Sequence, residues 1–119
     1  MHLTRVYADA GGESHFEDLD IPLTETGALG ALSELMPADG VIFRENEPGY
    51  DLDWHRAPRR QYIVLLDGAI EITVSDGASR AFRGGDVVLV EDTVGRGHRT
   101  RNIRPEHRRS LFIPLPQEA

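Results

Sequence analysis

Two segments of the chain carry the side chains whose type and spacing could do chemistry. The first begins at Gly49, has a histidine at His55 and continues to Gln61. The second begins at Gly85 and reaches His98. Imidazole suits proton transfer near neutral pH and is the commonest metal ligand in proteins. The two segments therefore indicate one pocket to which each contributes a histidine.

Such a pocket requires both segments to be β-strands. Residues two apart in a strand share a face of the sheet. This rule places Asp53 beside His55 and Thr100 beside His98, while Gln61 begins the next apolar strand. We therefore expect a ligand pocket lined by Asp53, His55, Gln61, His98 and Thr100.

The basic side chains are unusual because all 13 are arginine. The absence of lysine excludes Schiff-base catalysis and the lysine of a phosphate-binding loop. Residues 96–109 are rich in arginine, and we interpret them as a solvated face or as partners of the acidic N-terminal half. The alternative is a clamp for a carboxylate or phosphate, to which the planar guanidinium is matched. Arg56 and Arg99 are the first candidates for ligand contact.

Composition narrows the class of protein. The 119 residues suit one domain, residues 1–119. A net charge of −7 argues against nucleic-acid binding, which needs a basic surface. The chain has no cysteine, which excludes disulfides and thiolate metal sites. We find no signal-peptide pattern and no membrane-length apolar run, so we expect a cytoplasmic protein without membrane partners.

The rest of the chain predicts short β-strands separated by turns. The pairs Asp67-Gly68 and Asp76-Gly77 lie between apolar runs, as is typical of tight hairpins. Alternating or apolar runs predict strands at 2–8, 14–20, 41–45, 51–57, 61–66, 70–75, 86–90, 98–102 and 110–115. This pattern is typical of a β-sandwich or barrel, and its open edge strands favour a homodimer.

One segment, Thr24–Met36, predicts a helix. Leu29, Leu32 and Leu35 form a stripe at helical spacing, and Pro37 follows. Two glycines weaken this prediction by about 1 kcal/mol each. We expect an N-terminal arm that contains a short helix or an irregular segment.

The two histidine segments resemble the paired motifs of the cupin family. Gly49, His55, Gln61 and Gly68 stand at the positions of the first motif's glycine, first histidine, glutamate and final glycine. Ala57 stands where that motif has its second histidine. In the second motif, the matching positions are occupied by Gly85, Asp86, His98 and Asn102, and the intervening Pro-x-Gly turn is altered.

The resemblance covers about residues 41–115 and implies that they form the core of an all-β, double-stranded β-helix, also called a jelly roll or cupin-like barrel. It also implies that His55, Gln61 and His98 occupy three of the four positions that bind a divalent metal in such proteins. Zn, Ni, Fe or Mn would be the candidate cofactor, and otherwise none is expected. The substitutions at Ala57 and Gln61 remove one ligand and one negative charge, which weakens a metal site.

Three functions remain open at this point. The first is a small-molecule-binding protein of unproven activity. The second is a metal-dependent dioxygenase, isomerase or decarboxylase acting on a small organic substrate. The third is a metal-free enzyme in which His55 or His98 is a general base. Fold alone does not separate them.

Overall fold

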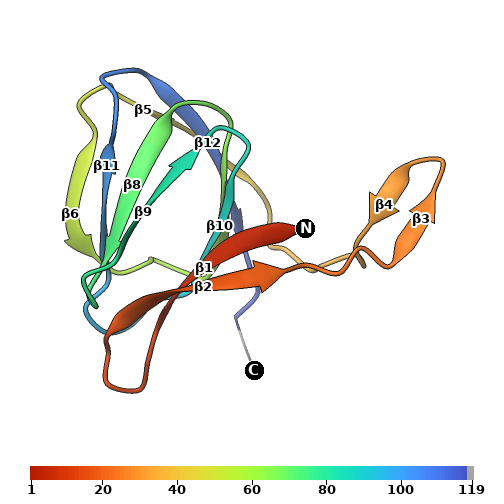
Figure 1. Cartoon of the computed structure of the whole chain (residues 1–119), viewed down its shortest axis with the longest axis horizontal. Coiled ribbons are helices and arrows are strands. Elements are labelled where there is room, and N and C mark those ends of the chain that lie inside the picture. Colours follow the sequence, from red (N-terminus) through yellow and green to blue (C-terminus); the bar gives the residue numbers. More distant parts are fainter. Residues whose placement is uncertain (118–119) are drawn as a thin grey trace.

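The structure, a computed structural model, describes residues 1–117 and consists of strands without a helix in that range. A six-stranded sheet has the order β2-β1-β10-β7-β12-β5, a four-stranded sheet has the order β6-β11-β8-β9, and β3 pairs with β4 (Figure 1). The strands are β1 (His2–Ala8), β2 (Ser14–Asp20), β3 (Glu25–Gly27), β4 (Gly30–Leu32), β5 (Ile42–Asn46), β6 (Asp51–His55), β7 (Gln61–Leu65), β8 (Ala69–Val74), β9 (Ser79–Arg83), β10 (Val87–Val90), β11 (His98–Asn102) and β12 (Arg108–Pro114).

The predicted strands are all present, within a few residues at their ends. The strands that the sequence did not predict are β3, β4 and β9. In β9, Arg80 and Arg83 are charged and Phe82 is the one buried side chain. In β8 the predicted alternation is confirmed, because Ile70, Ile72 and Val74 are buried while Glu71 and Thr73 are not.

The predicted helix at Thr24–Met36 is wrong. This segment contains the β3–β4 hairpin, with a turn at Ala28-Leu29, and it projects away from the two sheets (Figure 1). Leu29 is 86% exposed and Leu35 is fully exposed, so the leucine stripe has nothing to pack against. A short helix is marginal in water without such packing. Gly30 has a φ of +100°, a conformation that glycine readily adopts.

The two Asp-Gly pairs behave differently. Asp76-Gly77 forms the β8–β9 hairpin as predicted, with Gly77 N donating to the Val74 carbonyl. Asp67-Gly68 does not form a hairpin, because β7 belongs to the six-stranded sheet and β8 to the four-stranded one. Here the chain crosses between layers. A Cβ on Gly68 would lie 2.9 Å from the Arg108 side chain, so the crossing is tightly packed.

The core lies between the two sheets. It is formed by apolar side chains from both layers: Val6, Leu65, Val88 and Val90 from the larger sheet, and Ile70, Ile72, Val74 and Phe82 from the smaller one. Burying one such side chain contributes about 1.5–3 kcal/mol. Three of these core side chains, Ile70, Ile72 and Val90, also line the site described below. No helix in residues 1–117 is suited to crossing a lipid bilayer.

Candidate functional site

A cavity of about 250 Å³ opens between the two sheets. Its walls are mainly apolar, with Ile63, Ile70, Ile72, Val90 and Phe112 among them. The polar side chains that line it are Arg44, Tyr50, His55, Gln61, His98 and Thr100. Two histidines thus lie in an apolar enclosure, where electrostatic interactions are stronger than in water.

His98 is fixed by a buried carboxylate. The ring begins β11 and is 3% exposed, and its Nδ1 lies 2.5 Å from Oδ2 of Asp92, which is fully buried. A carboxylate partner holds the ring proton on Nδ1. The Nε2 atom then has no protein hydrogen bond within residues 1–117 and is left for whatever enters the cavity.

His55 faces His98 across the β6–β11 pair. The two residues are direct partners in the register, and their ring centroids are 4.5 Å apart. The Nδ1 atom of His55 lies 2.8 Å from the carbonyl oxygen of Asp53 and donates to it, so Nε2 is again unpaired among the described residues. Burial is the main cause that lowers the pKa of His55, and the nearby His98 and Arg44 lower that pKa further.

The close approach of the two histidines depends on Gly97. Its φ is +74°, and a Cβ there would lie 2.1 Å from the carbonyl oxygen of His55. Only glycine fits this position, because any other residue would collide with the β6 backbone. The missing side chain at Gly97 therefore allows the start of β11 to pack directly against the backbone of His55.

A β-bulge changes which β6 residues line the cavity. His98 pairs with His55, but Thr100 pairs with Leu52, so β6 has one extra residue in this interval. A bulge of this kind reorients side chains. Leu52 and His55 both line the cavity, whereas Asp53 does not; its Oδ1 accepts a hydrogen bond from the Trp54 backbone N–H instead. The structure therefore does not bring the expected Asp53 side chain to the other four residues.

Gln61 and Thr100 lie where the sequence placed them. Gln61 begins β7, is 2% exposed and lines the cavity, and Arg59 Nη1 lies 3.4 Å from its Oε1 atom. Thr100 is buried on the cavity wall two residues after His98. Four of the five expected pocket residues, His55, Gln61, His98 and Thr100, thus surround one space.

Three residues of the site were not identified from the sequence. Asp92 follows β10 beside Glu91, and nothing in the local pattern distinguishes the buried acid from its neighbour. Arg44 and Tyr50 lie on or near β5 and reach the cavity from the edge of the larger sheet. Neither belongs to a recognisable spacing, so the signal that identifies them is their position in the fold.

Arg56 and Arg99, the first candidates for ligand contact, do not line the cavity. Arg56 donates to the Gly95 carbonyl, and Arg99 lies 4.0 Å from Asp51. Several other arginines of residues 96–109 pair with acids of the chain, namely Arg96 with Glu13, Arg101 with Glu71 and Arg109 with Asp67. The interpretation of this cluster as partners of the acidic N-terminal half is confirmed for Arg96 among these three, whereas Arg101 and Arg109 pair with acids of the second half of the chain.

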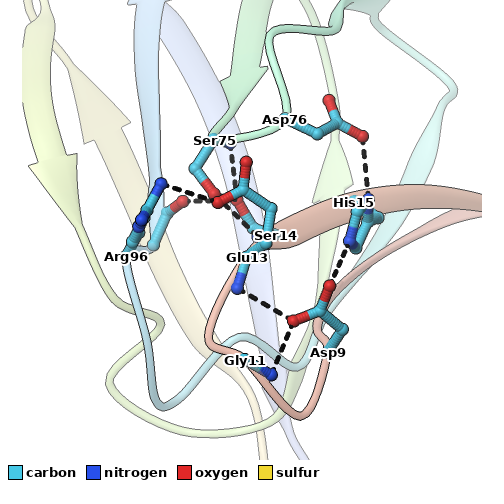
Figure 2. Close-up of polar contacts among 9 residues, drawn as sticks. Asp9, Gly11, Glu13, Ser14, His15, Ser75, Asp76 and Arg96 are labelled. Carbon is cyan, nitrogen blue, oxygen red and sulfur yellow. Dashed lines mark hydrogen bonds and ion pairs between the residues drawn. The ribbon is translucent and has the colours of Figure 1, made fainter.

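The loop before His98 is held by the N-terminal hairpin. Ser14 Oγ donates to the Gly97 carbonyl at 2.6 Å, and Arg96 pairs with Glu13 at 2.9 Å (Figure 2). Backbone contact between Gly12 and Gly95 is so close that a Cβ on Gly95 would lie 2.4 Å from the Gly12 carbonyl oxygen. The β1–β2 turn therefore supports the segment that leads into the site.

The side chains at the implied metal position supply only some of the donor atoms that a metal ion requires. The two free Nε2 atoms suit ligation, since metal-binding histidines donate their other N–H to a fixed acceptor. The remaining donor is the neutral amide of Gln61, and no carboxylate lines the cavity, whereas the cationic Arg44 does. Residues 1–117 contain no group of three His, Cys, Asp or Glu side chains placed to hold a metal. These donors alone do not match a resident metal centre.

Comparisons with known proteins concern the fold. No family model matches the chain. Oryzines biosynthesis cluster protein J of Aspergillus oryzae is 29% identical over 83 residues, which are 68% of this chain and 45% of that protein, so this chain spans less than half of that curated relative.

Solved structures provide the fold assignment. The protein NMB1881 from Neisseria meningitidis has a TM-score of 0.50 and 21% identity, covering 64% of this chain and 72% of that one. The cupin domain of Schizosaccharomyces pombe Cnp3 has a TM-score of 0.50 and 18% identity, covering 87% of this chain and 73% of that one. The chain is therefore an all-β protein with a cupin-like fold.

Proposed function

We propose that the chain is a small-molecule-binding protein of the cupin type, with a pocket built from His55, Gln61 and His98. The proposal rests on the geometry of two imidazoles in an apolar cavity, whose ring centroids lie 4.5 Å apart. In each ring Nδ1 is already hydrogen-bonded and Nε2 is free within the described residues. Few convergent polar groups among apolar walls are typical of ligand sites.

The strand connections support the finer description of the fold as a double-stranded β-helix. From β5 onward the chain passes repeatedly between the two sheets: β5, β7, β10 and β12 lie in the larger one, and β6, β8, β9 and β11 in the smaller one. The ligand site would then lie inside the barrel that these turns enclose.

The cavity limits the size of the ligand. At about 30 Å³ per water molecule, 250 Å³ holds about eight waters. A ligand of about eight to ten non-hydrogen atoms fits this volume. The free Nε2 atoms can each accept a hydrogen bond when neutral, so a ligand with hydroxyl or N–H groups at that end would be oriented by them.

The proposal is tested by screening small organic molecules with ¹H–¹⁵N spectra of the backbone and of the histidine side chains. Bound compounds should shift the side-chain resonances of His55 and His98 and backbone resonances around the cavity, and a His55→Ala, His98→Ala double variant should lose the backbone shifts. A His2→Ala, His107→Ala double variant serves as the matched control, because both of those histidines are exposed. Binding that survives loss of both cavity histidines would contradict the proposal.

A second candidate, a metal-free enzyme, is favoured by the buried Asp92–His98 pair. An aspartate on Nδ1 orients an imidazole and stabilises its protonated form, which is how a general base is supported. His98 Nε2 would take the proton from a bound substrate. If the candidate is right, turnover of any substrate found in the screen should fall at least about 100-fold in Asp92→Asn. An unchanged rate would exclude it.

A metal-dependent enzyme is the remaining candidate, in which the two fixed imidazoles would hold a metal whose other ligands the cavity residues do not supply. Protein purified without a histidine tag would be incubated with Zn, Ni, Fe or Mn, desalted and analysed for metal. Near-stoichiometric metal that is lost in the His55→Ala, His98→Ala double variant would support this candidate. Absence of metal after all four incubations would remove it.

We also propose that two copies associate through the projecting arm, residues 21–41. A lone two-stranded hairpin is at best marginally stable in water, so the arm needs a surface to pack on. Its exposed Leu29 and Leu35 give the arm an apolar surface that would pack against a second copy. Light scattering should find a dimer that Leu29→Glu, Leu35→Glu converts to a monomer. Val94→Glu, at an exposed residue outside the arm, should leave the mass unchanged; a monomeric wild type would refute the proposal.

A further inference from the structure

Arg44 places a cation at the wall of the cavity. It lies in β5, is half-buried, and its Nε donates to Ser110 Oγ at 3.0 Å. The guanidinium lies 4.3 Å over the ring of Phe112 and 5.7 Å from that of Tyr50. The side chain is therefore held by its Nε and by aromatic faces, which directs it toward the same space that His55 and His98 border.

No carboxylate in residues 1–117 forms an ion pair with Arg44. Elsewhere the chain pairs its partly buried arginines: Arg5 and Arg60 both bond Glu91, at 2.5 and 2.6 Å. A desolvated cation without a counter-ion is costly to a fold. Burial accordingly lowers the pKa of Arg44, which the neighbouring Tyr50 offsets in part. Arg5 and Arg60 thus share Glu91 as a counter-ion, whereas the described residues supply none to Arg44.

A second arginine adds positive potential near Tyr50. Arg108 is 1% exposed, its Nε donates to Asn102 Oδ1 at 3.0 Å, and its Nη1 and Nη2 have no partner within the described residues. Its guanidinium lies 5.3 Å from the Tyr50 ring, which Arg44 also approaches at 5.7 Å. Burial above all, and then Arg44, lowers the pKa of Arg108 to about 10. Arg108 acts through the field it adds, because it does not line the cavity.

The cavity wall therefore has a fixed cation, the guanidinium of Arg44, in the same space as two imidazoles whose Nε2 atoms are free among the described residues. An uncharged ligand would leave that cation without a partner, whereas an anion would supply one.

We infer that the ligand of this cavity is a small organic carboxylate whose anionic group pairs with Arg44. The inference rests on the proposed function and specifies its ligand class. A carboxylate matches the planar fork of a guanidinium, and the cavity limits the remainder of the molecule to a short, largely apolar group. The apolar walls at Ile63 and Phe112 would contact that group.

The test compares acetate, butyrate and benzoate with their uncharged amides, and includes inorganic phosphate. Binding is followed by the side-chain ¹H–¹⁵N resonances of His55 and His98. At least one carboxylate should bind about ten- to 100-fold more tightly than its amide, as expected for a hydrogen bond to a charged group. Arg44→Gln should abolish that preference, and the matched control Arg99→Gln should keep it.

The outcomes separate this inference from the proposed function. Equal binding of carboxylates and amides would leave the proposed function standing and overturn the inference, as would phosphate binding more tightly than every carboxylate. Binding of none of these probes would count against both. If Arg44→Gln does not fold by circular dichroism, Ser110→Ala frees the Nε of Arg44 while keeping its charge. It should then weaken carboxylate binding and leave amide binding unchanged, and an undiminished preference would overturn the inference.

Discussion

Two clusters that combine histidine with aspartate differ in what they can do. At the cavity, Asp92 and His98 are almost fully buried, with side-chain exposures of 0% and 4%. On the surface, His15 lies between Asp9 and Asp76, with Nε2 and Nδ1 at 2.7 and 2.8 Å from their carboxylates (Figure 2). The same chemical groups are thus found in the interior in one cluster and in contact with solvent in the other.

The number of free ring nitrogens explains the difference in what each cluster can do. Both nitrogens of His15 are bonded, so that imidazole joins the β1–β2 turn to the β8–β9 turn and has none left for a ligand. His98 has one nitrogen on Asp92 and directs the other into a cavity. A ligand site therefore requires a histidine with one unbonded ring nitrogen. Burial strengthens a hydrogen bond to that nitrogen, because electrostatic interactions are stronger in the protein interior than in water.

The largest effect is expected at Gly97, which connects the two clusters. Its carbonyl accepts from Ser14 and its Cα packs on the His55 backbone. Gly97→Ala adds a clash to an unfavourable φ, and should lower the free energy of unfolding by about 2–5 kcal/mol. Urea unfolding measures this. Gly77→Ala is the matched control, because its φ is +98° with nothing near the added Cβ; an equal loss in both variants would show that packing on His55 is unimportant.

The second-largest effect distinguishes the buried Asp92–His98 pair from the surface Asp9–His15 pair. Asp92→Asn places an amide N–H where the buried Oδ1 has no partner among the described residues, and it weakens the bond to His98. We expect a loss of about 1.5–3 kcal/mol in unfolding free energy. Asp9→Asn, on the surface, should cost less, because water replaces the lost partner. Thermal unfolding of both variants checks this order, and a larger loss from Asp9→Asn would reverse the comparison.

These contrasts also show what the sequence could and could not predict. The strands and the two histidines were predictable, because hydrophobic alternation and motif spacing are local properties. The exclusion of Asp53 was not, since a single-residue bulge in β6 shifts the alternation. Arg44 was missed for another reason: its importance lies in the lack of a counter-ion, which is a property of the folded surroundings. The helix at 24–36 failed because its apolar stripe has no surface in the chain to pack against.

A smaller effect is the pH dependence of the surface cluster. The hydrogen bond that His15 donates to Asp9, and then the one it donates to Asp76, raises the pKa of His15 above its ordinary value. The contribution of His15 to stability is thus fully present below about pH 6.5 and is lost as pH rises through the raised pKa. The pKa of Asp9 is lowered chiefly by His15, and that of Asp76 chiefly by the Ala78 backbone N–H, so their contribution is lost in acid.

The stability difference between wild type and His15→Ala should therefore be greatest between about pH 4 and 6.5. Above that range it should shrink to a constant remainder, because the ring of His15 also packs 5.6 Å from that of Tyr7. Urea unfolding from pH 4 to 9 measures the difference. An Asp9→Asn, Asp76→Asn double variant should remove its pH dependence while keeping the Tyr7 contact. A difference that stays the same from pH 5 to 9 would contradict this assignment.

The smallest effect is expected on the pKa of His55, the second histidine of the cavity. Burial is the main cause of its lowered pKa, with His98 contributing less. His98→Ala should therefore raise the pKa of His55 only in part, whereas Leu52→Ala, which opens the cavity wall to solvent, should raise it more. Side-chain ¹⁵N shifts followed against pH measure both. If His98→Ala alone restored the ordinary value, repulsion between the two rings would set the protonation of the site, and the neutrality of His55 would depend on its partner rather than on its enclosure.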